Sequence, residues 1–198
     1  MSASLAANRD ARDAPPWRGL PQRIAVVRAA LGLVWAAALL IVVGDEVPST
    51  SSDVPIAAAA LLTTYPAIDV VASIAAALGT HASGRLLRIN AALSAFAVAA
   101  IGAAAFGADA GATLVAFGAW AAVSGAIQFG VAVRRRAEGR QLPMIVSGGL
   151  STIAGISFLA ASGMDDAHLA TVAGYMALGA LLYLLWANRN RIAPQAAL

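Results

Sequence analysis

The chain has 198 residues, of which 60% are hydrophobic and only 12% are charged. A soluble domain is about 45–50% apolar and about 25% charged, so this composition excludes an ordinary soluble protein. The chain contains no cysteine, which excludes disulfides, thiolate metal ligands and cysteine nucleophiles. Its hydrophobic residues come in separate blocks of about 20 residues, the length that a helix needs to cross a bilayer.

The first 21 residues, MSASLAANRDARDAPPWRGLP, are polar and interrupted by prolines. A cleavable signal peptide has a short basic start and an apolar core of about 7–15 residues. Here the polar part is longer, and the apolar block after it is as long as a membrane span. We therefore expect a disordered cytoplasmic tail over 1–21, a membrane domain over 22–191 and a cytoplasmic tail over 192–198.

Six apolar blocks account for most of the remaining chain and predict six membrane-spanning helices. In lipid the backbone amides have no water to bond, so each span must be helical. Alanine-rich runs also favour helix by propensity. The predicted spans are residues 24–43, 54–78, 86–106, 110–133, 142–161 and 167–187. The predicted fold class is an all-α integral membrane bundle.

All thirteen basic residues are arginines, and they lie in the terminal segments, in two of the loops or at the adjoining span ends. They are Arg9, Arg12, Arg18, Arg23, Arg28, Arg85, Arg88, Arg134, Arg135, Arg136, Arg140, Arg189 and Arg191. The other three loops carry acids, namely Asp45, Glu46, Asp53, Asp109, Asp165 and Asp166. Because arginine-rich segments stay in the cytoplasm, we expect both termini there and an inner (plasma) membrane location.

Residues of the same kind recur at a spacing of 55 positions. Tyr65, Trp120 and Tyr175 lie in the three spans that run inward, and Arg85 and Arg140 precede two spans that run outward. A fixed period indicates a structural repeat. The recurrence predicts three antiparallel helix pairs laid down in the same direction.

One acid, Asp69, lies inside the predicted span 54–78. A charged aspartate at the bilayer centre costs about 2.5–3.5 kcal/mol or more, so it must be paired, protonated or near water. In the repeat, the positions that correspond to Asp69 hold the small residues Ser124 and Gly179. This correspondence predicts that Asp69 points into the bundle rather than at lipid.

Polar residues of the spans form a candidate intramembrane polar site: Asp69, Arg28, Asn90 and Gln128. Arg28 is the first candidate partner of Asp69, because the loop 44–53 makes the first two spans antiparallel neighbours. Arg88 and Asn90 are the other candidates, and Gln128 is expected to hydrogen-bond across helices. Two interpretations follow: an ion pair that fixes helix packing, or a proton- or ion-responsive site.

Small residues mark the faces on which membrane helices pack, because close backbone contact replaces the hydrophobic effect there. In the spans 110–133 and 142–161 we expect such faces at Gly118, Ala122, Gly125, Ala126, Gly130, Ser147, Ser151 and Gly155. A groove for cargo is the alternative interpretation of these stripes. Faces of this kind also favour association into a homo-oligomer.

The run RRRAEGR, between the fourth and fifth spans, is the densest charge cluster. It is typical of a topology determinant, and we expect Arg134, Arg135 and Arg136 to contact anionic lipid headgroups. The arginines form no separate basic domain, so no nucleic-acid partner is expected. The sequence has no phosphate-binding glycine loop and no serine–histidine or paired-carboxylate arrangement. We therefore expect no enzyme activity, no cofactor and no metal.

Three segments rich in glycine and serine carry a family resemblance: FGAWAAVSGAIQFGVAVRRR (117–136), MIVSGGLSTIAGISFLAAS (144–162) and VAGYMALGALLYLL (172–185). An arginine-rich inner turn joins the first two. In these features the chain resembles the HdeD family of small bacterial inner-membrane proteins, over about residues 22–190. The resemblance implies six membrane helices and, from the family's named member, a part in acid resistance. It implies no catalytic or ligand residues.

We therefore expect a non-enzymatic multi-pass inner-membrane protein of the HdeD type that supports tolerance of acid or envelope stress. The alternative is a small permease or channel in which Asp69 lines or gates the path, since intramembrane acids often mark such paths.

Overall fold

The structure, a computed structural model, describes residues 20–44, 50–78, 84–138, 141–165 and 168–191. Most of the predicted tail 1–21 and all of the tail 192–198 lie outside the described residues. The same holds for several of the charged residues that predict the orientation, namely Arg9, Arg12, Arg18, Arg140, Asp45, Glu46 and Asp166.

Six long α-helices make up nearly all of the described chain, in which no strand occurs. They are α2 (Leu20–Val43), α3 (Ile56–Leu78), α4 (Gly84–Gly107), α5 (Ala110–Arg134), α6 (Leu142–Ala161) and α7 (Ala170–Arg191), with a short 3₁₀ helix, η2 (Arg136–Glu138), after α5. The predicted spans agree with these bounds to within four residues. The largest differences are at the start of α2 and the end of α7, where the helix continues into polar residues beyond the apolar block.

All six helices are long and apolar enough to cross a membrane, with apolar stretches of 19 to 25 residues. Many large apolar side chains point outward instead of into the bundle. Ile41, Ile56 and Leu78 are each at least 80% exposed. Such a surface suits lipid, and the fold is that of a multi-pass membrane protein.

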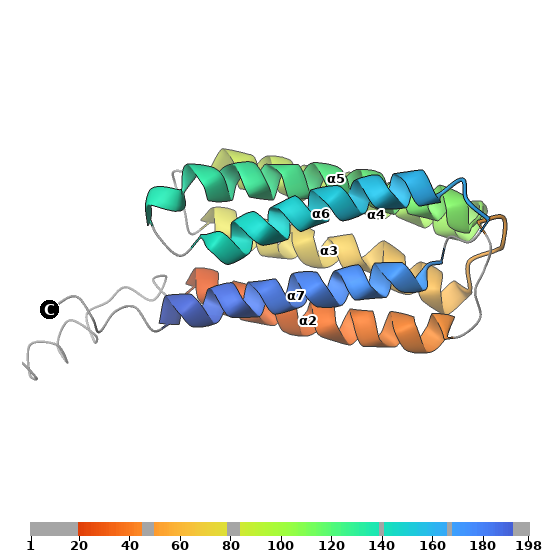
Figure 1. The fold of residues 1–198 in the computed structure, drawn as a ribbon, viewed down its shortest axis with the longest axis horizontal. Coiled ribbons are helices and arrows are strands. Elements are labelled where there is room, and N and C mark those ends of the chain that lie inside the picture. Colours follow the sequence, from red (N-terminus) through yellow and green to blue (C-terminus); the bar gives the residue numbers. More distant parts are fainter. Residues whose placement is uncertain (1–19, 45–49, 79–83, 139–140, 166–167, 192–198) are drawn as a thin grey trace, which may run out of the picture.

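The helices form a closed ring in which each contacts the next along the chain and α7 contacts α2 (Figure 1). Contacts are most extensive between α3 and α4, between α5 and α6, and between α7 and α2; the other three neighbouring pairs touch less. This alternation matches the predicted threefold repeat of antiparallel pairs. The loop 44–53 suggests α3 as the main neighbour of α2, but α2 packs more extensively on α7.

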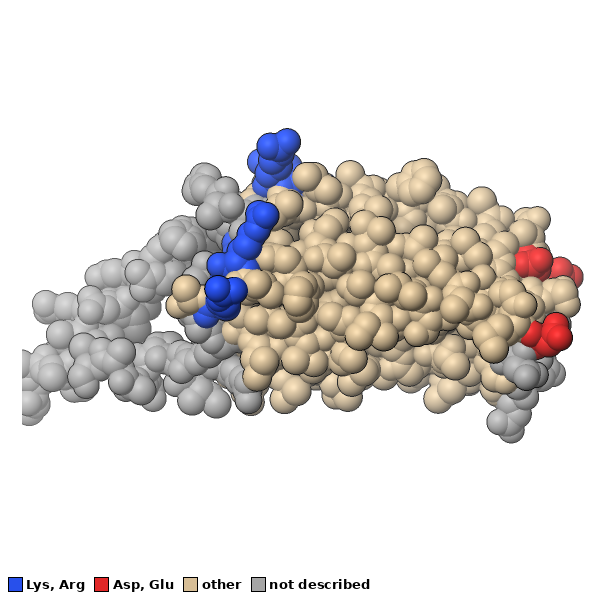
Figure 2. Space-filling view, turned by 45° about the horizontal axis from the view of Figure 1, so that its top comes forward, with Lys and Arg blue, Asp and Glu red and all other residues tan. Residues whose placement is uncertain are grey.

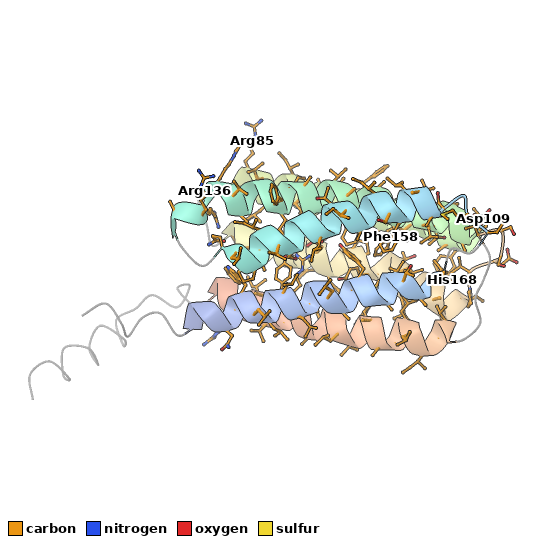
Figure 3. All side chains as sticks on the ribbon, viewed as in Figure 1. Arg85, Asp109, Arg136, Phe158 and His168 are labelled. Atoms are coloured by element: carbon orange, nitrogen blue, oxygen red, sulfur yellow. The ribbon has the colours of Figure 1, made fainter. Side chains whose placement is uncertain are left out.

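Charged side chains gather at opposite ends of the bundle (Figures 2 and 3). The arginine end is defined by Arg85 at the start of α4 and Arg136 after α5, and the aspartate end by Asp109 before α5. Asp109 also caps α5, because its carboxylate accepts a 2.7 Å hydrogen bond from the backbone N–H of Ala112. The start of α2 and the end of α7 both lie at the arginine end.

Helices α5 and α6 approach so closely that glycine is required at their contact. A Cβ added at Gly118, Gly125, Gly148 or Gly155 would lie only 2.3 to 2.8 Å from its nearest backbone atom on the facing helix. Ser151 also lies against Gly125. The predicted contact face is therefore confirmed at Gly118, Gly125, Ser151 and Gly155.

The prediction that Gly130 belongs to this face is wrong. No neighbouring helix comes within 4 Å of the position of a Cβ at Gly130, and Ala126 is exposed. An α-helix turns once in 3.6 residues, so a strict four-residue spacing drifts off the contact face. The face continues instead from Ala122 through Gly125 to Phe129, whose backbone lies against Gly148.

Candidate functional site

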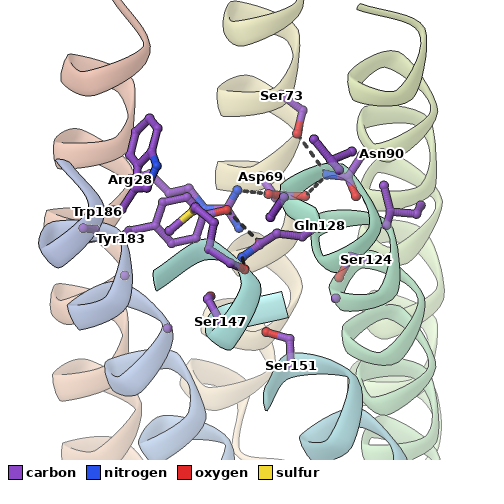
Figure 4. Close-up of a pocket in the computed structure, with 18 of the residues that line it drawn as sticks. Arg28, Asp69, Ser73, Asn90, Ser124, Gln128, Ser147, Ser151, Tyr183 and Trp186 are labelled. Carbon is purple, nitrogen blue, oxygen red and sulfur yellow. Dashed lines mark hydrogen bonds and ion pairs between the residues drawn. The ribbon is translucent and has the colours of Figure 1, made fainter. Parts of the chain in front are cut away.

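Arg28 of α2 and Asp69 of α3 form an ion pair inside the bundle (Figure 4). The Asp69 side chain is only 4% exposed and the Arg28 side chain 23%. Asp69 lies about 13 Å from the end of α3 at 1.5 Å per residue. The predicted contact is present, and it explains how a carboxylate is kept at a depth where an unpaired charge would be costly.

The second carboxylate oxygen of Asp69 accepts two hydrogen bonds from α4. Asn90 Nδ2 donates to Oδ2 at 2.6 Å, and the Ser94 hydroxyl donates to the same oxygen at 2.7 Å. The Trp120 indole N–H of α5 donates to the Ser94 oxygen at 3.0 Å. Hydrogen bonds to a charged acceptor are the stronger kind. One carboxylate thereby connects α2, α3 and α4 directly, and α5 through Ser94.

Sequence reasoning missed Ser94 and the donor role of Trp120. Ser94 follows Asn90 by four residues, so the two share one face of α4; that spacing is the signal that could have identified it. Arg88, another candidate partner of Asp69, donates from Nε to the Gly84 carbonyl of its own helix at 3.2 Å.

Gln128 is joined to the ion pair through Tyr183 rather than by direct contact. The Tyr183 hydroxyl donates to Gln128 Oε1 at 2.9 Å, and Gln128 Nε2 donates to the Met144 carbonyl at 3.4 Å. The Arg28 guanidinium lies over the Tyr183 ring, 4.4 Å from its centroid, a cation–π contact. All four predicted polar residues therefore belong to one cluster, and Tyr183, like Ser94, is a member that the sequence did not predict.

Asn90 carries a polar atom that this cluster leaves unsatisfied. Its Nδ2 donates to Ser73 Oγ at 3.0 Å as well as to Asp69. Its Oδ1 is buried and accepts no hydrogen bond from the described residues. A buried acceptor without a donor costs about 1–3 kcal/mol.

A cavity of about 200 Å³ lies at the centre of the bundle and has walls from all six helices. Its polar lining consists of Arg28, Asp69, Ser73, Asn90, Ser124, Gln128, Arg135, Gln141, Ser147, Ser151, Tyr65, Tyr175 and Tyr183. It extends to Leu86, Arg135 and Gln141 at the arginine end. This volume is far more than one water molecule needs, so the cavity has room for several waters or a small solute.

Corresponding residues of the three repeat units come together at this cavity. The corresponding positions Asp69, Ser124 and Gly179 all line it, as predicted for Asp69. Ser147 and Ser151, predicted as packing residues, are buried and line it as well.

A cluster of aromatic rings separates the cavity from the aspartate end. It consists of Tyr65, Phe117, Trp120, Phe158 and Tyr175. Their ring centroids lie 5.3 to 6.1 Å apart, mostly edge to face, which is the favoured geometry for aromatic pairs. Three of these residues are the ones that recur at 55 positions, so the repeat brings them together across the ring of helices. We refer to these five residues as the aromatic cluster.

Metal ligands do not gather in the part of the chain that the structure describes. No group of three His, Cys, Asp or Glu residues there could hold a metal ion. His168 lies at the aspartate end, away from the cavity (Figure 3).

No protein-family model, no curated protein and no solved structure matches this chain. The likeness to the HdeD family therefore rests on the three glycine- and serine-rich segments alone.

Proposed function

We propose that the protein is a small permease of the inner membrane whose central cavity binds a small polar solute entering from the arginine end. The observation that supports this proposal is the placement of the cavity. It carries charged and polar side chains, lies at membrane depth, reaches one end of the bundle and is separated from the other end by the aromatic cluster. Polar and ionisable groups are costly inside a membrane and commonly mark solute pathways.

The lining offers a solute both donors and acceptors. Arg28 supplies guanidinium N–H groups and a positive charge, and the Ser147 and Tyr183 hydroxyls can donate or accept hydrogen bonds. The cavity is smaller than the roughly 300–1,000 Å³ usual for drug-sized ligands, which favours a small solute. In this proposal the residues bind and release, no bond of the solute is made or broken, and neither cofactor nor metal takes part.

In this proposal the aromatic cluster is the closed gate on the aspartate side. Passage would require the aromatic side chains of α3, α5, α6 and α7 to separate, because they contact one another across the ring of helices. The Arg28–Asp69 pair forms the wall of the path on the arginine side of this gate.

The proposed orientation in the membrane follows from the arginines. By the positive-inside rule the arginine end is cytoplasmic, so both termini lie in the cytoplasm and the cavity faces it. Arg134, Arg135 and Arg136 would then contact anionic headgroups of the inner leaflet.

The stress role implied by the HdeD resemblance is a second prediction, which is compatible with a permease and independent of the cavity. A deletion strain is expected to survive less well than its parent at low external pH. Equal survival at every pH would leave that role unsupported without touching the permease proposal.

Because the natural chain has no cysteine, single introduced cysteines report directly on access to the cavity. Ser147→Cys lines the cavity, whereas Thr113→Cys is a matched control, fully buried outside it. A membrane-impermeant methanethiosulfonate should modify Ser147→Cys at least tenfold faster from the cytoplasmic side than from the other side. It should leave Thr113→Cys unmodified from both. Equal rates at the two positions would remove the aqueous cavity on which the proposal depends.

Transport itself is tested in proteoliposomes with glycerol, glycine and formate as probes. Uptake of at least one probe should exceed that of protein-free vesicles and should fall at least tenfold in Asp69→Asn. Uptake equal to that of protein-free vesicles for all three probes, from a cavity that labels as expected, would overturn the permease proposal while keeping the cavity.

A further inference from the structure

A second hollow lies on the outer surface of the bundle, between α2 and α3. It has a volume of about 510 Å³, and its lining is almost entirely apolar. The residues that form its rim, Val27, Leu31 and Val71, are between 36% and 68% exposed. Since the outer surface of a membrane-spanning bundle faces lipid, this α2–α3 groove opens toward the bilayer.

The groove forms where α2 and α3 pack loosely. Each of them contacts its other neighbour, α7 or α4, more extensively than the two contact each other. On α3 the lining positions include the small residues Ala67, Ala72 and Ala75, which leave space. At the deep end of the groove the Trp35 indole N–H donates to the Thr64 hydroxyl at 3.0 Å, which joins the two helices there. The space therefore ends at a side-chain contact rather than continuing to the aspartate end.

The length of the groove matches one leaflet of a bilayer. From Arg23 to Trp35, α2 rises about 18 Å at 1.5 Å per residue. Half of a hydrocarbon core of about 30 Å is about 15 Å. An acyl chain that begins at the membrane surface beside Arg23 would therefore reach the region of Trp35.

The charge at the arginine end of the groove favours an anionic headgroup. Arg23 is exposed there, and none of the lining residues is acidic. Arg28 also lines the groove, but its charge is paired with Asp69, so Arg23 supplies the charge for a headgroup. Arginine binds phosphate with paired, charge-assisted hydrogen bonds. An anionic headgroup at the membrane surface is thus complementary to the end of the groove where Arg23 lies.

We propose that the α2–α3 groove is a specific site for one anionic phospholipid of the leaflet on the arginine side. Its phosphate contacts Arg23, and one acyl chain lies along Val27, Leu31 and Ala67 toward Trp35. Arg28 lines both this groove and the central cavity, so the bound chain covers the outer side of the Arg28–Asp69 pair. Lipid binding at this groove does not depend on the transport of any solute.

The experiment is lipid retention by the full-length protein, measured by native mass spectrometry after purification with phosphatidylglycerol or phosphatidylcholine of the same chain length. The wild type should retain one phosphatidylglycerol through detergent washes that remove phosphatidylcholine. Arg23→Gln should lower phosphatidylglycerol retention about tenfold, the loss of one charge-assisted contact. Ala67→Phe, which fills the groove, should lower retention at least as much.

Two matched controls separate the groove from the general surface. Ala99→Phe adds the same side chain on the exposed face of α4, and Arg85→Gln removes one exposed arginine from the same end of the bundle. Both should retain the lipid as the wild type does. If Ala67→Phe fails to purify as a monodisperse species, Ala67→Leu replaces it. Equal retention of the two lipids by the wild type, unchanged retention in Ala67→Phe or Ala67→Leu, or a loss in Arg85→Gln as large as in Arg23→Gln would each overturn the proposal.

Discussion

The α5–α6 contact and the corner where α2, α3 and α4 meet hold helices together by opposite means. At α5–α6, glycines let the two backbones touch, and a Cβ at Gly155 would lie 2.3 Å from the Ala122 nitrogen. At the corner, the link between helices is made by side chains, with Asp69 bonded to Arg28, Asn90 and Ser94.

The difference indicates which helix contacts leave room for cavities in this membrane bundle. Lipid gives helices little hydrophobic reason to associate, so they need either close packing or polar bonds. Close packing at α5–α6 leaves no space between those helices. Polar bonds let α2 and α3 stand further apart, and the cavity and the α2–α3 groove both have walls from these two helices. The α5–α6 contact thus joins its helices by backbone packing, whereas the corner supplies Arg28, which lines both the cavity and the groove.

Breaking the α5–α6 contact should have the largest effect on stability. In Gly155→Ala the new methyl group would meet backbone of α5 on two sides, at 2.3 Å and 2.5 Å, and the helices must move apart. We expect a loss of about 3 kcal/mol in the free energy of unfolding, the upper part of the usual range for overpacking. Thermal unfolding in detergent, followed by size-exclusion chromatography, measures the loss.

The matched control is Gly174→Ala on α7, where a Cβ would meet nothing within 4 Å. Alanine is the better helix former by about 1 kcal/mol, so this variant should be as stable as the wild type or more so. Equal losses at the two positions would mean that helix flexibility, rather than backbone contact, is what glycine provides at α5–α6.

Removing the charge of Asp69 tests how much the ion pair stabilises the corner. Asp69→Asn keeps the shape but leaves the Arg28 guanidinium without its counter-charge. Breaking a buried pair usually costs about 3–5 kcal/mol, and the partial exposure of Arg28 lowers our expectation to about 2 kcal/mol. In an Arg28→Leu background the same change should cost much less, because no charge is left unpaired. Equal losses in both backgrounds, measured as thermal unfolding in detergent, would show that the pair does not stabilise the corner.

These two regions also differ in how far sequence could predict them. Six spans, their bounds and the separation of arginines from acids follow from hydropathy and charge, because lipid constrains both strongly. The Arg28–Asp69 contact was predictable for the same reason: Asp69 is the one acid inside a predicted span, and Arg28 lies within a neighbouring one. The expectation failed at Gly130, because a small residue marks a contact only if the helix turns it toward a neighbour.

Other features have no local signal in the chain. The packing of α2 against α7 joins the two ends of the domain, so neither loop length nor the order of the spans indicates it. Tyr183 combines a cation–π contact with Arg28 and a hydrogen bond to Gln128, which depends on three helices at once. The cavity is the space that six helices leave between them, and its volume depends on every side chain around it.

The smallest expected losses of unfolding free energy come from removing the indole N–H of two tryptophans, Trp120 and Trp35. Trp120→Phe keeps an aromatic ring in the aromatic cluster but removes the N–H that donates to Ser94, a fully buried residue. Interhelical hydrogen bonds in membranes contribute about 0.6 kcal/mol on average and up to about 1.7, and we expect about 1 kcal/mol here. Trp35→Phe removes a donor to Thr64, which is exposed and donates to the carbonyl of Ala60 at 2.7 Å. The bond ends on an exposed hydroxyl, so its loss should stay below about 0.5 kcal/mol, under the average for interhelical bonds in membranes. A Trp35→Phe variant that unfolds as early as Trp120→Phe would contradict the view that the hydrogen bonds around Asp69, rather than tryptophan packing in general, hold the corner together.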